Sequence, residues 1–290
     1  MVSEKYAYIT YLSSDNYLVG VLALNYQLKK LKSRYPLIVI ITDDIKSETV
    51  DIIKRNGLKY ILSSKPSISS KIINNNKKNG NSNWNNTFGK LGIFGMIKFN
   101  KIVYLDSDML IRKNIDNLFK KEHLSSVIAG TKFPGNENWS QTLNSGLMVI
   151  VPKKNEDKRL FSLIGKGDLK DVGGDQGVIH TAYPNWTKKK SLHLDESYNL
   201  LAPYESYYLC QGLINHNNLK VVHYIGSNKP WTMNNFKKNK RIIGLIYRSL
   251  KVNHSFKGLN YTLADFIYYY NLCKKLKKNL NVNCNNKLNT

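Results

Sequence analysis

The chain has 290 residues, a formal net charge of +24 and a hydrophobic share of 42%. This length suits one large α/β domain plus an extension, and the hydrophobic share excludes wholesale disorder. No apolar run reaches 18 residues and the N-terminus leaves no room for a signal peptide, so we expect neither a transmembrane segment nor export. The three cysteines are far apart and show no zinc or disulfide spacing, which fits a reducing, cytoplasmic location: Cys210, Cys273 and Cys284.

The positive charge could attract nucleic acid, anionic membranes or acidic glycans. The lysines are scattered, however, and no nucleic-acid motif accompanies them. The chain is also rich in residues with A/T-rich codons, so genome composition explains part of the excess. We therefore expect no specific nucleic-acid partner, whereas a positive field that draws in an anionic substrate remains an option.

The first part of the chain alternates strands with helices. Apolar runs predict strands at 6–12, 37–42 and 60–62, and helical spacing predicts helices at 17–31 and 47–57. Such alternation indicates a parallel sheet with crossover helices. The polar segment 63–86 allows two interpretations, a disordered surface loop or a lid that orders over a bound ligand.

The pattern continues with a helix at 88–99 and a strand at 102–105. Further predicted elements are a helical segment near 115–119, strands at 127–129, 147–151 and 221–224, and helices at 156–164 and 176–183. Beyond residue 231 the chain is strongly basic. Thr262 and Asp265 resemble a capping box before an apolar stripe, and four lysines between 274 and 278 would lie near the helix C-terminus. We favour a packed helix there over one on a membrane surface.

Two carboxylates follow the strand that ends at Leu105. Asp106 and Asp108 are separated by one residue, and ligands collect at the carboxyl ends of strands in α/β sheets. Asp-x-Asp at such an end offers hard oxygen ligands to a divalent cation and leaves positions open for a phosphate-bearing substrate. An acidic surface turn would produce the same pattern, so the motif alone leaves both interpretations open.

Three later motifs accompany this acidic pair: Asn144-Ser-Gly146, Gly173-Gly-Asp175-Gln176-Gly177, and Val221-Val-His223-Tyr-Ile-Gly226-Ser-Asn-Lys229-Pro-Trp231. In this order and at these separations, the set resembles glycosyltransferase family 8, in particular its glycogenin-like members, from about Tyr6 to Trp231. The resemblance implies an α/β, GT-A-like nucleotide-sugar-binding domain with a mainly parallel mixed sheet over residues 1–231. Residues 232–290 would form a basic, helical C-terminal extension and tail.

The resemblance also implies a metal site. Asp106, Asp108 and His223 match the family's metal ligands, and an imidazole ligand favours Mn²⁺, with Mg²⁺ as the alternative. Lys229 matches a lysine on the diphosphate of a UDP-sugar donor, and Gly226 permits close approach of the backbone to phosphate. Lys90 matches another lysine near the donor, although an exposed helix lysine is its ordinary interpretation.

The remaining matched residues would surround the nucleoside and the sugar. The implied nucleoside side consists of Thr10, Tyr11, Tyr17 and Ser107. The implied sugar side consists of Asn144, Asp175 and Gln176, and Tyr198 with Asn199 matches a family pair near the sugar or the acceptor. Asp175 or Gln176 would lie beside the anomeric carbon, so the implied catalytic residues are Asp175, Gln176 and Lys229.

Two positions depart from the family pattern. The family commonly has an aspartate directly before the Gly-Gly pair, whereas this chain has Val172, with Asp171 one residue earlier. The tyrosine that glycogenin-like enzymes glucosylate on themselves corresponds to Ser206, with Tyr204, Tyr207 and Tyr208 close by. The acceptor is therefore open.

Together these features predict a metal-dependent, retaining hexosyltransferase. It would move a sugar, with glucose favoured, from a UDP-sugar such as UDP-glucose to a hydroxyl acceptor, its own tyrosine included, and would pair into a homodimer. One alternative is a family-8 transferase that moves galactose or another sugar to another protein or a glycan. Another is a basic binding protein on an inactive transferase scaffold, against which the intact Asp106, Asp108 and His223 set speaks.

Overall fold

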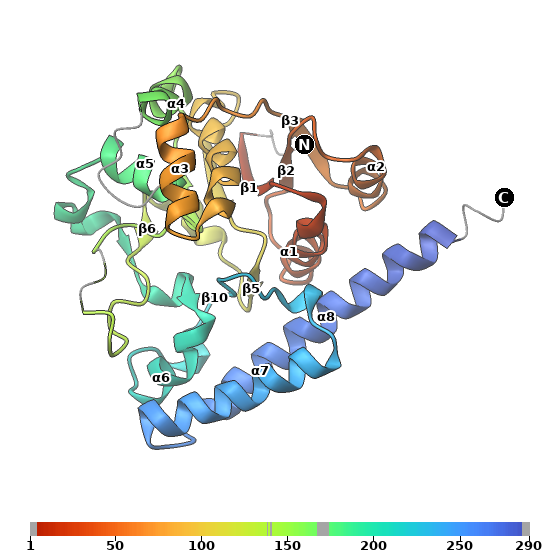
Figure 1. The fold of residues 1–290 in the computed structure, drawn as a ribbon, viewed down its shortest axis with the longest axis vertical. Helices are drawn as coiled ribbons and strands as arrows, with labels where there is room; N and C mark the ends of the chain where they lie inside the picture. Colours follow the sequence, from red (N-terminus) through yellow and green to blue (C-terminus); the bar gives the residue numbers. More distant parts are fainter. Residues whose placement is uncertain (1–4, 138, 140, 167–173, 286–290) are drawn as a thin grey trace.

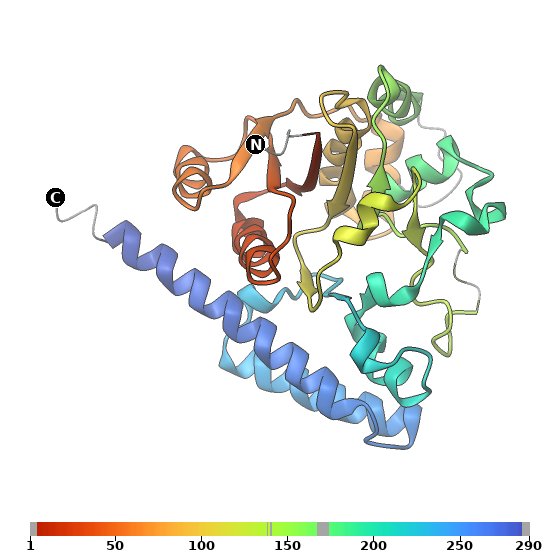
Figure 2. The same ribbon diagram turned by 180° about the vertical axis from the view of Figure 1, so that it is seen from behind.

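The computed structural model describes residues 5–137, 139, 141–166 and 174–285, and its centre is a seven-stranded sheet (Figures 1 and 2). The strand order is β3-β2-β1-β4-β7-β6-β8. The strands are β1 (Tyr6–Leu12), β2 (Leu37–Ile41), β3 (Lys59–Leu62), β4 (Lys101–Leu105), β6 (Ser126–Val127), β7 (Leu147–Ile150) and β8 (His193–Leu194). Only β7 runs antiparallel to its neighbours β4 and β6. The predicted mainly parallel mixed sheet is confirmed.

Alternation along each strand gives the sheet two apolar faces. In β1, Tyr8 and Leu12 face one core and Ile9 faces the other. Helices α1 (Leu18–Lys30) and α2 (Ser47–Arg55) contribute to the first core. The second core is shared with the 3₁₀ segment 88–95, α4 (Glu156–Lys166) and α5 (Asp175–Ala182). Helices therefore cover both faces, as a buried parallel sheet requires.

A second, small sheet has the order β5-β10-β9, with β5 at Met109–Ile111, β9 at Leu200–Leu201 and β10 at Val221–His223. β10 runs antiparallel to β5, and His223 lies opposite Met109. Met109, the residue after Asp108, is thus paired with a histidine 114 positions away in the chain. This pairing was not predicted from the sequence, because a three-residue strand carries little periodicity.

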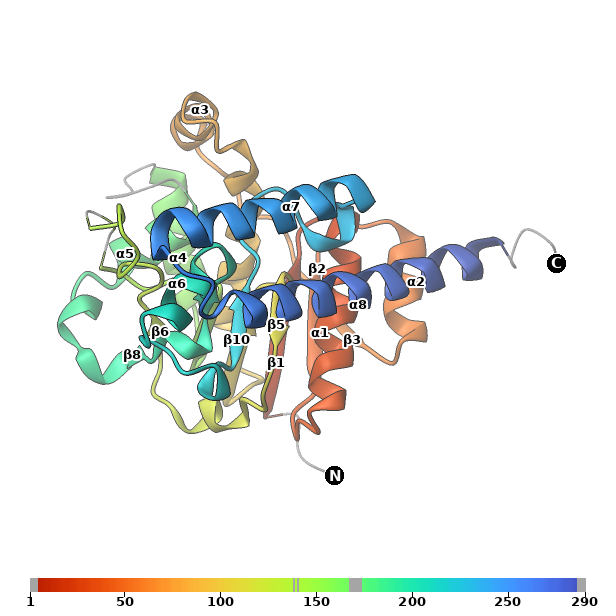
Figure 3. The same ribbon diagram turned by 90° about the horizontal axis from the view of Figure 1, so that it is seen from below.

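The C-terminal part is a helical hairpin. α7 (Asn235–Arg248) continues through a π-helical turn (Ser249–Asn253) and returns as α8 (Leu259–Asn285), and the two helices lie side by side (Figure 3). The apolar side chains of α8 pack with Val19 and Ala23 of α1 and with the short helix α6 (Glu205–Cys210). The packed helix is confirmed, and α7 was not predicted.

Two details of that prediction are wrong. Thr262 does not cap the helix, because α8 begins at Leu259, and its hydroxyl donates to the Gly258 carbonyl at 3.3 Å. Asp265 instead forms an ion pair with Arg112, whose Nε lies 3.0 Å from its Oδ2. The lysines at 274–278 lie before the helix end, because the helix continues to Asn285.

The polar segment before Lys90 is ordered, so the disordered-loop interpretation is wrong. It contains α3 (Ser70–Lys78) and a 3₁₀ segment at Ser82–Asn86. Ser69 caps α3 through the Ile72 amide, and the side chain of Ile72 is buried in the second core. The buried Ile72 anchors this helix, whose other residues are polar except for the exposed Ile73. Closure of this segment over a ligand remains a prediction.

The helix expected at 88–99 is instead a 3₁₀ helix at Phe88–Gly95. The segment near 115–119 is also 3₁₀, at Asp116–Lys120. Further short 3₁₀ segments are Asp15–Tyr17, Trp186–Lys188, Lys190–Leu192, Glu196–Tyr198, Ala202–Tyr204, His216–Asn218 and Pro230–Thr232. In the part of the chain that the structure describes, no helix has the length and apolarity that crossing a bilayer requires.

Gly20 is the closest contact between α1 and the acidic loop. A Cβ placed there would lie 2.5 Å from the Ser107 carbonyl oxygen and 2.8 Å from the Trp231 ring. The first of these neighbours is backbone, so it cannot move aside without displacing Asp106 and Asp108. The helix can approach the loop only because this residue has no side chain.

We expect Gly20→Ala to lower the free energy of unfolding by about 1–3 kcal/mol, the usual cost of overpacking. Chemical denaturation followed by circular dichroism measures it. Gly244→Ala is the matched control: Gly244 lies in α7 with nothing within 4 Å of its Cβ position. Alanine there should stabilise the helix slightly. Equal stability of the Gly20→Ala protein and the wild type would show that the loop yields freely.

Candidate active site

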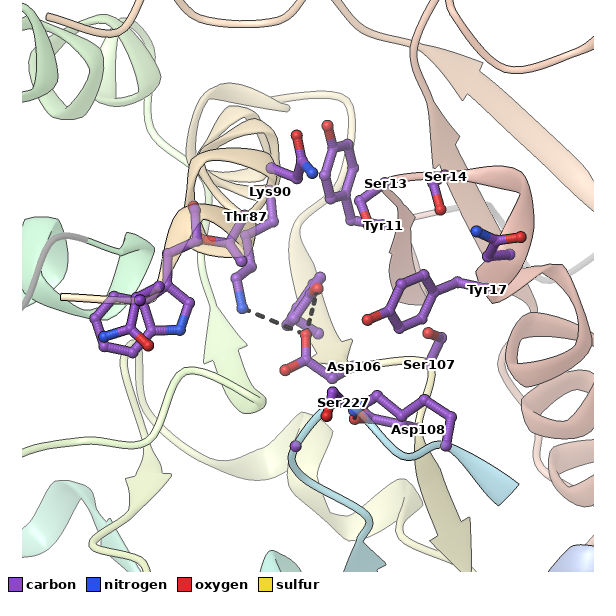
Figure 4. Close-up of a pocket in the computed structure, with 18 residues that line it drawn as sticks. Tyr11, Ser13, Ser14, Tyr17, Thr87, Lys90, Asp106, Ser107, Asp108 and Ser227 are labelled. Carbon is purple, nitrogen blue, oxygen red and sulfur yellow. Dashed lines mark hydrogen bonds and ion pairs between the residues drawn. The ribbon is translucent and has the colours of Figure 1, made fainter. Parts of the chain in front are cut away.

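A cavity of about 650 Å³ opens at the carboxyl edge of the large sheet, where β1 and β4 lie side by side (Figure 4). β1 leads on one side to β2 and on the other to β4, so the cavity lies where the strand order reverses, the usual ligand position in open α/β sheets. Tyr11 and Tyr17 project into it on one side, and Asp106 and Lys90 border it on another.

The acidic loop after β4 is held by its backbone. The Asp106 amide donates to the Gly146 carbonyl at 2.8 Å, and the Asp108 carbonyl accepts from the Tyr224 amide at 2.9 Å. These bonds bring Asp106, Asp108 and His223 together, with one ligand atom of each within 4.8 Å of the others. His223 Nε2 lies 3.2 Å from Asp108 Oδ1 and 3.8 Å from Asp106 Oδ2. The three predicted metal ligands therefore form one cluster.

A chain of amides orients His223. The Gly146 amide can only donate, and it points at Asn144 Oδ1 at 3.0 Å. The same oxygen accepts from Asn199 Nδ2 at 2.9 Å, so Asn199 turns its Oδ1 toward His223 Nδ1, at 3.0 Å. Nδ1 must therefore carry the proton in this bond, and in the neutral ring Nε2 keeps its lone pair toward the carboxylates. Such a partner commonly fixes a metal-binding histidine.

Two buried lysines balance the carboxylates. Lys229 Nζ forms an ion pair with Asp108 Oδ2 and donates to the Tyr224 carbonyl at 3.1 Å. Burial alone would raise the pKa of Asp108, but His223 and Lys229 outweigh it and hold that pKa well below its usual range. Because Asp108 stays ionised, it remains a ligand for a cation.

Lys90 lies between Asp175 Oδ2 at 2.9 Å and Asp106 Oδ1 at 3.3 Å. Burial alone would lower the pKa of Lys90, yet Asp106 and Asp175 raise it above its usual value. Only 3% of the residue is exposed, so the interpretation as an ordinary surface lysine is wrong. The Tyr104 hydroxyl also donates to Asp106, at 2.7 Å. A lysine and a tyrosine thus fix one side of this carboxylate.

A second cavity of about 390 Å³ adjoins the first and shares the wall of Lys90, Asp106, Asp108 and Lys229. Its own lining includes Asn144, Ser145, Asp175, Gln176, His180 and His223. Gln176 Oε1 accepts from the Ser145 amide at 3.3 Å, which fixes its side chain. The cluster of carboxylates and lysines thus separates a larger chamber with aromatic side chains from a smaller one with amide and carboxylate groups.

Most residues predicted from the sequence line these two cavities, but three do not. Thr10 is fully buried in β1 and is absent from both linings. Tyr198 packs in the first core, and its hydroxyl accepts from Asn117. Asn199 supports His223 and lines neither cavity, and Tyr198 lines neither cavity as well, so a place of this pair near the sugar or the acceptor stays a prediction. Asp171, Val172 and Gly173 lie outside the described residues.

Several lining residues were not predicted. Trp84, Thr87 and Tyr104 border the first cavity, and Ser13, Ser14 and Ser227 add hydroxyl groups. The Thr87 hydroxyl accepts from the Asp175 amide at 3.2 Å and donates to the Trp84 carbonyl at 2.8 Å, so it ties the polar segment to α5. Trp84 and Thr87, shortly before Lys90, could have indicated a binding surface in the sequence. They were overlooked because the segment around them is rich in asparagine.

The fold and its cavity belong to the GT-A-like glycosyltransferases. The family model for glycosyl transferase family 8 matches residues 8–235, and the chain belongs to this family. It is 29% identical over 252 residues to inositol phosphorylceramide glucuronosyltransferase 1 of Arabidopsis thaliana, covering 79% of this chain and 43% of that protein. It is 28% identical over 251 residues to glycogenin-1 of Oryctolagus cuniculus, covering 81% of this chain and 68% of glycogenin-1.

Among solved structures, the glycosyltransferase GlyE of Streptococcus pneumoniae TIGR4 has the same fold, with a TM-score of 0.52 and 18% identity. The likeness covers 92% of this chain and 63% of GlyE. The chain spans less than half of the plant relative's length and about two thirds of rabbit glycogenin-1. The predicted family and fold are confirmed, and the chain is a glycosyltransferase.

If the amide chain orients His223, Asn199→Ala should weaken divalent-metal binding. Loss of such a supporting partner typically costs about 10–100-fold in metal affinity. Free Mn²⁺ measured by electron paramagnetic resonance during titration of the protein gives the affinity. Asn217→Ala removes the same side chain from an exposed position and should bind as the wild type. An unchanged affinity in a folded Asn199→Ala protein would contradict the orienting role.

Proposed function

We propose that this enzyme is a metal-dependent, retaining hexosyltransferase that uses a UDP-sugar. The observation that supports this most is the order of groups across the two cavities. Aromatic rings and hydroxyls come first, then two lysines with two carboxylates, then amide and carboxylate groups. A base and ribose, a diphosphate with its cation, and a hexose require these groups in that order.

The donor set fits a divalent cation. Two carboxylates and an imidazole nitrogen with its lone pair turned inward converge within 4.8 Å. Such a mixed O and N set suits Mn²⁺, with Mg²⁺ as the alternative. When bound, the cation would neutralise the charge that develops on the diphosphate as the glycosidic bond breaks. Asp106, Asp108 and His223 would hold it.

Lys229 would act on the same leaving group. Its ammonium is buried against Asp108 and projects from the segment that follows Gly226. Gly226 has φ +91 and nothing within 4 Å of its Cβ position, so the backbone there is open to a phosphate. A lysine preorganised beside the diphosphate favours the transition state over the bound donor, because the negative charge grows as the bond breaks.

The nucleoside would occupy the side lined by Tyr11 and Tyr17. Burial raises the pKa of Tyr11 to about 12, and burial is also the main reason why the pKa of Tyr17 is raised. Both hydroxyls therefore stay protonated at neutral pH. Each ring thus offers an apolar face for a base and a hydroxyl donor for a ribose. Ser107, between the two carboxylates, lines the same chamber and would face the ribose.

Asp175 and Gln176 would position the hexose in the smaller chamber. Asp175 is held by Lys90, and Gln176 by the Ser145 amide, so both side chains are fixed before a sugar binds. Their carboxylate and amide groups would hydrogen-bond sugar hydroxyls and stabilise the oxocarbenium-like carbon. Glucose is the donor sugar we favour, on the similarity to glycogenin-1, whereas the name of the plant relative describes glucuronosyl transfer.

An external hydroxyl acceptor is more consistent with the geometry than self-glycosylation. Ser206, Tyr204 and Tyr208 are buried, and none of the three lines either cavity. Tyr204 stacks on Phe133, and the Tyr208 hydroxyl accepts from the Lys132 amide. Tyr207 is the partly exposed member of the group. A homodimer that presents Tyr207 to a second active site remains the glycogenin-like alternative.

Removal of one metal ligand tests the reaction. Asp108→Ala should lower both UDP-sugar hydrolysis and transfer by at least about 100-fold, because several kcal/mol of leaving-group stabilisation are lost. Chromatography of released UDP with Mn²⁺ present measures this loss. Asp51→Ala, an exposed carboxylate on α2, is the control and should keep its activity. Full activity of the Asp108→Ala protein, or of the wild type in EDTA, would refute the proposed site.

The acceptor assignment has its own test. After incubation with UDP-glucose and Mn²⁺, mass spectrometry of the peptide spanning 203–212 should show no added hexose, because its hydroxyl-bearing residues line neither cavity. Tyr207→Phe should then leave donor hydrolysis unchanged. Hexose on this peptide in the wild type but not in Tyr207→Phe would instead support self-glycosylation, with a homodimer that presents Tyr207 to a second active site.

A further inference from the structure

The outward face of α7 carries a row of exposed apolar side chains. Phe236, Ile243, Tyr247 and Leu250 are 75%, 66%, 63% and 42% exposed. Their spacing of seven, four and three residues places them along one line of the helix. Phe256, in the turn before α8, is 60% exposed as well. We call these five residues the α7 apolar row.

The inward face of α7 already has its partners. Leu245 is buried, and Ile242 and Ile246 pack against the apolar cluster that α8 forms with α1 and α6. The apolar row is therefore not needed to attach α7 to the protein. Contiguous apolar side chains held in solvent usually mark a surface that binds something.

The charge around the row is of one sign. Residues 235–257 contain seven lysines and arginines and no aspartate or glutamate. Lys237, Lys240 and Lys251 are exposed, and at helical spacing they follow one edge of the apolar row. Among residues 232–290 the single acidic side chain is Asp265, which is buried and paired with Arg112. A partner of this face must offer both an apolar phase and negative charge.

We propose that the α7 face docks on an anionic membrane surface, with the helix lying in the plane of the headgroups. A bilayer interface accepts the apolar row at the boundary of the acyl chains and the flanking lysines among anionic headgroups. A second copy of the chain is less suited, because pairing the same face would bring its cations together. Nucleic acid would engage the lysines but leave the apolar row without a partner.

Docking would also bring the membrane close to the active site. α7 begins at Asn235, shortly after Lys229 in the wall of both cavities and after Trp231, whose Nε1 donates to the Asn16 carbonyl at 2.8 Å. In Figure 3, α7 and α8 lie side by side across the lower side of the molecule. The helix that carries the proposed surface thus follows shortly after the cavity wall in the chain, and it contributes no residue to either cavity lining.

Flotation with lipid vesicles tests the proposal. The wild type should float with vesicles of phosphatidylcholine containing 30% phosphatidylserine and remain unbound with phosphatidylcholine alone. Replacing three exposed members of the row, Phe236→Ser, Ile243→Ser and Tyr247→Ser, should weaken binding at least tenfold with the charge unchanged. Replacing the adjacent cations, Lys237→Gln, Lys240→Gln and Lys251→Gln, should have a similar effect.

The matched control removes the same charge elsewhere: Lys188→Gln, Lys189→Gln and Lys190→Gln, which are exposed on a separate segment. This variant should bind vesicles as the wild type does. Equal losses in both lysine variants, full binding by the serine variant or no binding by the wild type would each overturn the proposal. Sedimentation that shows a dimer lost only in the serine variant would assign the face to a second copy instead. Circular dichroism verifies that each variant is folded.

Discussion

The pairing of buried carboxylates with buried lysines at the end of β4 is the constraint on which the site depends. Asp108 faces Lys229 and His223, and Lys90 joins Asp106 to Asp175. An unpaired charge at this depth would be costly, so these carboxylates and lysines stabilise one another. The same pairs are the groups that a nucleoside diphosphate and its cation would need. The charges that stabilise one another here would thus also receive the proposed donor.

This arrangement requires segments that are far apart in the chain to converge on one loop. β10 brings His223 opposite Met109, and α5 brings Asp175 to Lys90. From the C-terminal hairpin, the Tyr269 hydroxyl donates to the Ser107 carbonyl at 3.4 Å, the same oxygen that Gly20 approaches. The basic extension therefore packs directly behind the acidic loop. The predicted domain boundary at residue 231 is therefore a division of the sequence, because residues beyond it contact the acidic loop.

The sequence could predict the large sheet and the acidic pair because both depend on local signals, whereas His223 was assigned through the family resemblance. Continuous β-branched runs mark buried strands, and Asp-x-Asp after such a run identifies the edge where ligands bind. The roles of Asn144 and Asn199 could not be predicted in this way. Both amides are polar enough to bind a sugar, and only the contact with the Gly146 amide shows that they orient His223. The packing of Tyr198 in the first core could not be predicted either, because burial is decided by the tertiary fold.

The roles of the many lysines can be separated only when the exposure of each side chain is known. Lys90 and Lys229 are buried and bound to carboxylates, whereas the lysines of α7 are exposed beside an apolar row. The sequence periodicity predicted that α8 is an amphipathic helix. In the structure its apolar side packs against α1 and α6. α7 supplies one side to the same core and leaves a second apolar side uncovered. The lysines thus have two roles in this fold. Lys90 and Lys229 neutralise the acidic site, whereas the exposed lysines of α7 form a surface whose charge is complementary to an anionic interface.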